Sequence, residues 1–153
     1  MYERLIMKIL AIASVGGHWI QLLRLRPAFK GHDIVYVSTH QEYSTMVEGH
    51  QFYAVPDSNR WQKTKLLKTF SVLMKIIFKE RPNVIISTGA APGLIALCIG
   101  KLIGARTIWV DSIANAEKLS LSGKFAIKIA SRVYTQWPEL SNDKLIFKGS
   151  VIR

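Results

Sequence analysis

The chain has 153 residues, of which 49% are hydrophobic, and its 21 Lys+Arg against 10 Asp+Glu give a formal net charge of +11. The length is typical of one domain, so we expect residues 1–153 to form one, and the hydrophobic content excludes a disordered chain. A single cysteine excludes an internal disulfide, and no uncharged apolar stretch reaches the ~18 residues of a membrane-spanning helix. The excess of positive charge indicates a polyanionic partner, either an anionic membrane surface or a nucleic acid.

The first predicted unit is a strand, a glycine turn and a helix. The apolar run 6–13 predicts a buried strand, and residues 18–29 predict a helix closed by Gly31. Ser14, Gly16, Gly17 and His18 lie at the turn between them. Glycines there let the backbone approach a ligand closely, and the free N–H groups of a helix start attract anions. The positive end of the helix dipole favours a neutral imidazole at His18, which could accept a proton from a hydroxyl. The alternative is a tight turn with an incidental histidine.

The next elements are strands over 33–38 and 51–55, a short helix within 40–48 and a long helix over 61–80. Apolar residues at helical spacing predict the core-facing side of the long helix: Leu66, Leu67, Phe70, Leu73, Met74, Ile77 and Phe78. The opposite side combines lysines with three apolar residues: Trp61, Lys65, Lys68, Val72, Lys75, Ile76 and Lys79. Apolar side chains among lysines suit an anionic membrane surface, although a charged face can also simply be solvated.

The second half of the chain continues the alternation of strands and helices. We expect strands at 83–87, 106–110, 132–135 and 145–147, with one helix after Gly93 to about Ile103 and another near 123–131. This pattern predicts an α/β fold with a Rossmann-like parallel sheet and helices on both faces. Right-handed crossovers then bring the loops 14–19, 87–93 and 111–117 to one edge of the sheet, where they should form one cleft.

Two of these loops carry further candidate residues. Thr88, Gly89 and Ala90 are small and permit close approach of a sugar or diphosphate, although they would equally suit helix capping and packing. Asp111, with Ser112 beside it and Glu117 downstream, places a carboxylate at a strand end in a chain that has few acids. We expect Asp111 and Glu117 to orient His18 or to bind a sugar hydroxyl. A capping aspartate on a solvated loop is the alternative.

Several classes of site are not supported by the sequence. The glycine turn lacks the G-x-G-x-x-G dinucleotide pattern and the lysine of a P-loop. The four histidines and the lone cysteine show no metal-ligand spacing, so we expect neither a metal nor another cofactor. A hydrolase G-x-S-x-G elbow and the known nucleic-acid motifs are also missing, so a nucleic-acid partner is not expected.

Five motifs together resemble a known family: Ser14–His18, Ser87–Ala90, Trp109–Ala114, Leu119–Lys124 and Gln136–Leu140. In this order they resemble PssD-type (also CpsF-type) polysaccharide glycosyltransferase subunits of bacteria. That family is similar to the anchoring subunit of the eukaryotic enzyme that adds the second N-acetylglucosamine to dolichol-linked oligosaccharide. The Gly-Gly-His loop alone is shared with MurG-like transferases.

The resemblance implies the fold of the amino-terminal half of a GT-B glycosyltransferase. A PssE-type partner subunit would supply the other half, which binds the UDP-sugar. This half would bind the acceptor, a saccharide on a polyprenyl diphosphate, with the family's glycine-loop histidine at His18 and its strand-end acid at Asp111. Eukaryotic members carry an amino-terminal spanning helix, whereas this chain begins close to its first strand, so we expect peripheral attachment at the cytoplasmic face of the membrane. The alternative function is a non-catalytic membrane scaffold that recruits a separate, complete transferase.

Overall fold

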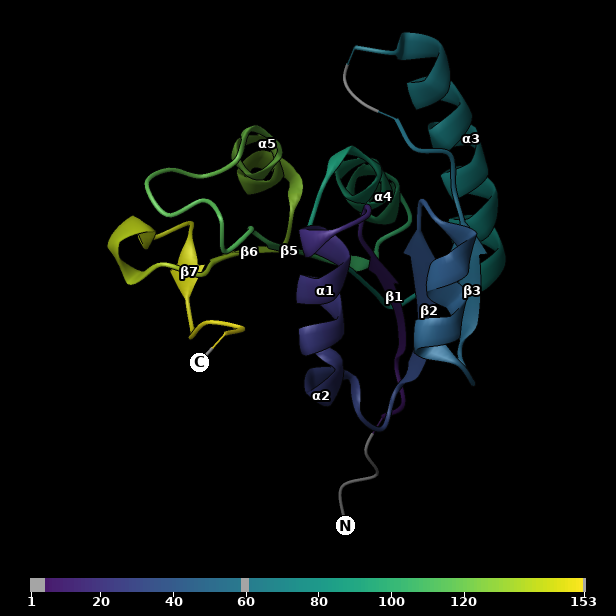
Figure 1. Cartoon of the computed structure of the whole chain (residues 1–153), viewed down its shortest axis with the longest axis horizontal. Helices are drawn as coiled ribbons and strands as arrows, with labels where there is room; N and C mark the ends of the chain where they lie inside the picture. Colours follow the sequence, from purple (N-terminus) through teal and green to yellow (C-terminus); the bar gives the residue numbers. More distant parts are fainter. Residues whose placement is uncertain (1–4, 59–60, 153) are drawn as a thin grey trace.

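One parallel sheet organises the molecule. The computed structural model describes residues 5–58 and 61–152, and within them seven strands lie in the order β3-β2-β1-β4-β5-β6-β7 (Figure 1). In chain order the strands are β1 (Lys8–Ile12), β2 (Asp33–Ser38), β3 (Gln51–Ala54), β4 (Val84–Ser87), β5 (Arg106–Val110), β6 (Arg132–Thr135) and β7 (Ile146–Phe147). All the described pairings are parallel, so the carboxyl ends of the strands share one edge of the sheet.

Helices connect the strands and lie on both faces of the sheet. They are α1 (Gly17–Arg24), α2 (Arg26–Phe29), α3 (Lys63–Glu80), α4 (Ala91–Leu102) and α5 (Leu121–Ile129), with 3-10 turns η1 (Gln41–Val47) and η2 (Pro138–Leu140). The chain moves from β1 to β2 and β3 on one side of the sheet and from β4 to β7 on the other. Right-handed crossovers therefore place α1, α2 and η1 on one face and α3, α4 and α5 on the opposite face.

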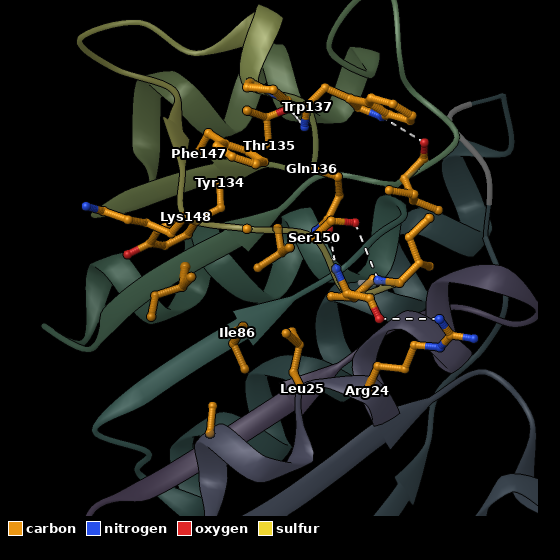
Figure 2. Close-up of a pocket in the computed structure, with 18 of the residues that line it drawn as sticks. Arg24, Leu25, Ile86, Tyr134, Thr135, Gln136, Trp137, Phe147, Lys148 and Ser150 are labelled. Atoms are coloured by element: carbon orange, nitrogen blue, oxygen red, sulfur yellow. Dashed lines mark hydrogen bonds between the residues drawn. The ribbon is translucent and has the colours of Figure 1, made fainter.

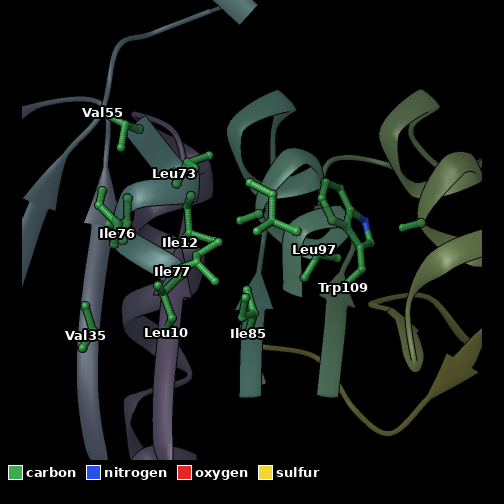
Figure 3. Close-up of a cluster of buried hydrophobic side chains, with 14 of the residues drawn as sticks. Leu10, Ile12, Val35, Val55, Leu73, Ile76, Ile77, Ile85, Leu97 and Trp109 are labelled. Carbon is green, nitrogen blue, oxygen red and sulfur yellow. The ribbon is translucent and has the colours of Figure 1, made fainter. Parts of the chain in front are cut away.

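The alternation of side chains along β1 divides the core into two clusters. Leu10 and Ile12 point to one face, where Leu73 of α3 and Leu97 of α4 pack on them (Figure 3). Ile9 and Ala11 point to the other face and belong to a cluster with residues of α1, such as Trp19 and Leu22. Successive residues of a strand face opposite sides, so a strand buried on both faces must be apolar throughout. This explains the unbroken apolar run that predicted the strand.

The helix predicted over 18–29 is two helices. It ends at Arg24, and a four-residue helix begins at Arg26. Pro27 causes the break, because proline has no N–H to continue the hydrogen-bond ladder and is tolerated in the first turn of a new helix. Other boundaries differ from prediction by a few residues: the first strand starts at Lys8, and the long helix starts at Lys63, so Trp61 precedes it.

The orientation of α3 differs from prediction. Its buried residues are Thr69, Leu73, Ile76 and Ile77, and Val72 packs partly against the same core. Ile76, expected on the outer surface among the lysines, is therefore in the core. Three residues expected in the core are exposed instead: Leu67 by 69%, Phe70 by 40% and Phe78 by 50%. The helix has more apolar residues than one buried stripe requires, so periodicity alone could not identify the buried one.

Candidate functional site

The first and second predicted loops are joined directly at the carboxyl edge of the sheet. His18, in the first turn of α1, has its Nδ1 atom 2.9 Å from the carbonyl oxygen of Thr88. The Thr88 hydroxyl in turn donates to the carbonyl oxygen of His18 at 2.6 Å. The Ser14 N–H donates to the carbonyl oxygen of Gly89 at 2.8 Å. These three bonds hold the end of β1 and the start of α1 against the turn that follows β4.

The contact with Thr88 determines the protonation pattern of the His18 ring. A carbonyl oxygen only accepts hydrogen bonds, so Nδ1 must carry the hydrogen. In the neutral ring this leaves Nε2 unprotonated, with a lone pair that can accept a proton. The side chain is half-buried, so the ring is held in place but remains in contact with solvent.

Gly89 provides the space in which the His18 ring lies. Its φ of +120° is a conformation that residues with a side chain rarely adopt. A Cβ atom at Gly89 would also lie 2.5 Å from Nδ1 of His18. Both the backbone angle and the close approach therefore require glycine at this position, in direct contact with the imidazole.

The third loop is organised by the buried carboxylate of Asp111. Oδ1 accepts from the Trp109 indole N–H at 2.9 Å and from the Ser120 hydroxyl. Oδ2 accepts from the Asn115 amide at 3.1 Å and from the Ser120 N–H at 3.0 Å. Asp111 is only 2% exposed, and these four bonds connect the end of β5 to the start of α5. The His18 imidazole is thus oriented by Thr88, and the carboxylate of Asp111 orders its own loop.

Gln21 attaches this third loop to α1. Its side-chain amide donates to the carbonyl oxygen of Asp111 at 3.0 Å, and its Oε1 accepts from the Ile113 N–H at 3.1 Å. All three predicted loops are therefore connected through α1, which confirms their convergence at one edge. A polar residue within the apolar run 19–23 is the sequence signal that could have identified Gln21. Glu117 is exposed on the same loop, and its predicted role stays a prediction.

Tyr43 is a further residue of the site that sequence reasoning missed. Its hydroxyl oxygen accepts from the Gly16 N–H at 3.1 Å. Its ring stacks on the buried Trp19, with centroids 5.1 Å apart and planes 9° apart. Tyr43 thereby fixes the turn η1 beside the glycine loop. The fold brings Tyr43 close to the glycine loop, and no pattern in the sequence indicates this contact.

The remaining predicted binding residues surround this junction. Gly16 and Gly17 are exposed at the start of α1, and a Cβ atom at either would meet nothing within 4 Å. The φ of +71° requires glycine at Gly16, whereas Gly17 has no such constraint from the fold. Ala90 is the half-buried residue before α4, and the Ser112 hydroxyl accepts from the Ala114 N–H. The amino end of α1 has neither a side-chain cap nor an acidic residue in its first turn.

A separate cavity of about 880 Å³ opens beside this junction. It lies on the sheet face that α1 and α2 cover only in part, with Ile86, Ile108 and Val110 on its floor. The carboxyl-terminal segment closes another side: the Val151 N–H donates to the side chain of Gln136, and Arg24 donates to the Val151 carbonyl oxygen. Figure 2 shows Arg24, Gln136 and Trp137 around this cavity.

The lysines predicted to contact a membrane, Lys65, Lys68, Lys75 and Lys79, are all exposed on α3. The ammonium of Lys79 lies 5.8 Å from the centre of the Tyr53 ring. No helix in the described residues is long and apolar enough to cross a bilayer. The same residues contain no group of three or more His, Cys, Asp or Glu side chains that could hold a metal ion.

Solved structures share this fold at low sequence identity. MurG of Acinetobacter baumannii superimposes with a TM-score of 0.76 and 13% identity over 93% of this chain and 45% of its own. UDP-N-acetylglucosamine 2-epimerase of Rickettsia bellii gives 0.73 and 14% over 96% of this chain and 46% of its own. The chain therefore spans less than half the length of these proteins. The predicted architecture, a Rossmann-like sheet equivalent to the amino-terminal half of a GT-B glycosyltransferase, is confirmed.

Curated relatives carry one shared description. "UDP-N-acetylglucosamine transferase subunit ALG14" of Yarrowia lipolytica is 35% identical over 48% of this chain and 37% of its own length. The human protein of the same description is 23% identical over 95% of this chain and 83% of its own. Residues 39–151, well over half of the chain, match the family described as "Oligosaccharide biosynthesis protein Alg14 like". The chain belongs to this Alg14-like family of oligosaccharide biosynthesis proteins.

Proposed function

We propose that this chain is the acceptor-binding subunit of a two-component, metal-independent glycosyltransferase. The complex would transfer a sugar from a UDP-sugar to a saccharide on a polyprenyl diphosphate. The observation that carries the proposal is the hydrogen bond between His18 Nδ1 and the Thr88 carbonyl oxygen, because it leaves Nε2 free to accept a proton. The family description and the GT-B half fold support it.

In the proposed reaction His18 is the general base. Nε2 takes the proton of the acceptor hydroxyl as its oxygen attacks the anomeric carbon of the donor. The bond from that carbon to the diphosphate breaks, and UDP leaves with the electron pair. A single displacement of this kind inverts the anomeric configuration. The fixed Nδ1–H contact keeps the ring in one tautomer throughout the approach.

The glycine loop would receive the diphosphate of the acceptor. Gly17 is glycine although the fold leaves open space for a side chain, which is consistent with a ligand that approaches the backbone. The uncapped amino end of α1 favours negative charge. Ser14, Thr88, Gly89, Ala90 and Ser112 form the surrounding turns, and we propose that they shape the saccharide pocket.

The donor site would belong to a partner subunit, of the PssE type in the bacterial nomenclature. The chain spans 45% of MurG, so a second half of similar size is needed for a complete GT-B enzyme. We propose that the partner docks at the cavity between α1 and the carboxyl-terminal segment, which the sheet residues Ile86, Ile108 and Val110 line. Residues 148–152 line this cavity and would form part of the partner surface. The relatives' description supports UDP-N-acetylglucosamine as the donor.

We propose that the complex works at the cytoplasmic face of a membrane, where this subunit is peripherally attached. A polyprenyl chain keeps the acceptor in the bilayer, and a net charge of +11 attracts the chain to anionic lipid.

The test of the proposed base is His18→Ala in the complex reconstituted with the partner. We expect kcat to fall by about 10²–10⁴, the contribution typical of a general base. His50→Ala, at an exposed histidine whose ring contacts Tyr36, is the matched control and should keep its activity. A loss smaller than about tenfold for His18→Ala would remove His18 from the role of base.

A further inference from the structure

We propose that the outer face of α3 is a membrane seat: it inserts apolar side chains into an anionic bilayer beside the acceptor site. This deepens the proposed function and rests on its membrane-bound acceptor. The apolar part of the seat comprises Trp61, Leu67, Phe70 and Phe78; of these, only Trp61 is also among the apolar residues that the sequence assigned to a membrane.

The first turns of α3 have little protein to pack against. Among residues 61–68 only Leu66 is even half-buried, and the first buried residue is Thr69. In Figure 1 this end of α3 projects well beyond the tips of the strands, on the edge where α1 begins. Trp61 is 78% exposed and Leu67 is 69% exposed on this projection. Most of the apolar surface of these two side chains is therefore in contact with water.

Apart from Lys63, which lies one turn before Leu67, the long exposed side chains of α3 separate into two flanks. Leu67, Phe70 and Phe78 follow helical spacing along one flank, which faces α4, since Phe78 and Ile103 line one small pocket between the ends of these helices. Leu102 of α4, which is 80% exposed, is a neighbour of Ile103 in the chain.

The other flank is basic and faces the opposite way. Lys79 lies over the ring of Tyr53 in the edge strand β3, and Lys68 and Lys75 share this side of the helix. An apolar flank next to a lysine flank is the arrangement of a helix that lies in the plane of a membrane interface.

Charge identifies the occupant as anionic lipid. α3 carries five lysines, and its one acid, Glu80, is bound by Lys8 and Tyr53. A second copy of the chain would bring another five lysines against this face, which disfavours self-association. Anionic headgroups complement the lysines, and the headgroup and acyl boundary accommodates the apolar flank. The seat reaches the edge of the sheet that holds His18. It would therefore keep the acceptor site at the membrane surface, where the diphosphate of the acceptor lies.

The test compares binding of the full chain to vesicles of phosphatidylcholine and of phosphatidylcholine with phosphatidylglycerol. The Leu67→Glu/Phe70→Glu variant should bind the anionic vesicles at least about tenfold more weakly, because two large apolar side chains no longer leave water. Replacing Lys63, Lys65 and Lys68 by Gln should lower the affinity for anionic vesicles by about a hundredfold and should change the affinity for neutral vesicles little. The matched control is Leu5→Glu/Ile6→Glu, which adds the same charge at two exposed apolar residues before β1 and should bind like wild type.

Three results would overturn the seat. The first is unchanged vesicle binding by a folded Leu67→Glu/Phe70→Glu variant. The second is equal loss in the Leu5→Glu/Ile6→Glu control. The third is wild-type chain that does not bind vesicles but forms a dimer, or holds its partner, through this face. Vesicle binding requires no turnover, so a failure of the transferase proposal would show separately, as a lack of activity even on a short-chain, water-soluble acceptor. On that acceptor the α3 variant should keep its turnover.

Discussion

Gly89 determines where the imidazole of His18 can lie. Adding one methyl group would place a carbon 2.5 Å from Nδ1, at a backbone φ of +120°. We expect Gly89→Ala to displace the ring, break its contact with Thr88, and destabilise the fold by about 1–3 kcal/mol. Turnover of the complex should fall nearly as far as in His18→Ala.

Gly104→Ala is the control for this prediction. Gly104 also has a positive φ, of +79°, but lies at the opposite edge of the sheet with nothing within 4 Å of the added Cβ. It should lose stability and retain turnover per folded molecule. If both variants lose activity equally, the effect of Gly89→Ala comes from backbone strain and not from displacement of the His18 imidazole.

Asp111 offers a second test at single-residue scale. Its carboxylate accepts four hydrogen bonds in a buried site, so an amide in its place would turn an NH₂ group toward other donors. We expect Asp111→Asn to lower the unfolding free energy by about 2–4 kcal/mol in urea titrations. Glu117→Gln, at an exposed residue of the same loop, should stay within about 0.5 kcal/mol of wild type. Lost turnover at unchanged stability would instead indicate that Asp111 acts directly on the substrate.

The sequence predicted which loops meet but not how their side chains pair. The position of His18 at a strand-to-helix turn followed from local pattern. Its partner Thr88 lies 70 residues away, and their pairing depends on the order of strands in the sheet. Asp111 appeared free for chemistry because Asn115 and Ser120, which supply three of its four donors, become its neighbours only when the loop folds back.

At the scale of elements, one ion pair connects β1, β3 and α3. Lys8 lies 3.1 Å from Glu80, and Tyr53 donates to the other carboxylate oxygen. Burial alone would raise the pKa of Glu80, but the hydrogen bonds from Tyr53 and Lys8 outweigh it and lower the pKa below its ordinary value. The folded state therefore binds this proton less readily than the unfolded chain does.

The lowered pKa predicts a loss of stability in acid. A carboxyl with a depressed folded pKa stabilises the fold above its unfolded pKa, and this is lost as the pH falls through the folded value. We expect the unfolding free energy to decline below a pH of about 4.3, the ordinary pKa of glutamate. Urea titrations of Glu80→Gln should show a shallower decline, and those of the exposed Glu48→Gln should follow wild type. Parallel curves for Glu80→Gln and wild type would contradict this role.

Elements were predictable where one pattern dominated and were not where two competed. The sequence of a strand such as β2 is apolar and β-branched and fits no other element, and its predicted bounds agree with the structure. The outer face of α3 could not be identified because the helix carries two apolar stripes. Packing on the sheet selects the stripe with Leu73 and Ile77 and leaves Leu67 and Phe70 outside.

At the scale of the whole molecule, the sheet is covered unevenly. Helices α3, α4 and α5 cover one face, but over β4, β5 and β6 the other face opens into the 880 Å³ cavity. The alternation of strands and helices predicted the sheet. The cavity was not predictable from the sequence. A strand that helices cover on both faces and a strand that lines a cavity on one face have the same apolar sequence. We propose that the partner subunit docks at this cavity.

We propose that this chain completes an active site only together with a second polypeptide. The most direct measurement is sugar transfer from a UDP-sugar to a polyprenyl-diphosphate saccharide by this chain alone, by the donor-binding partner alone, and by the two together. We expect turnover in the mixture only, and we expect it to be lost when the mixture contains His18→Ala. Undiminished turnover by the partner alone would instead show that this chain does not contribute to the active site and would make it a membrane scaffold.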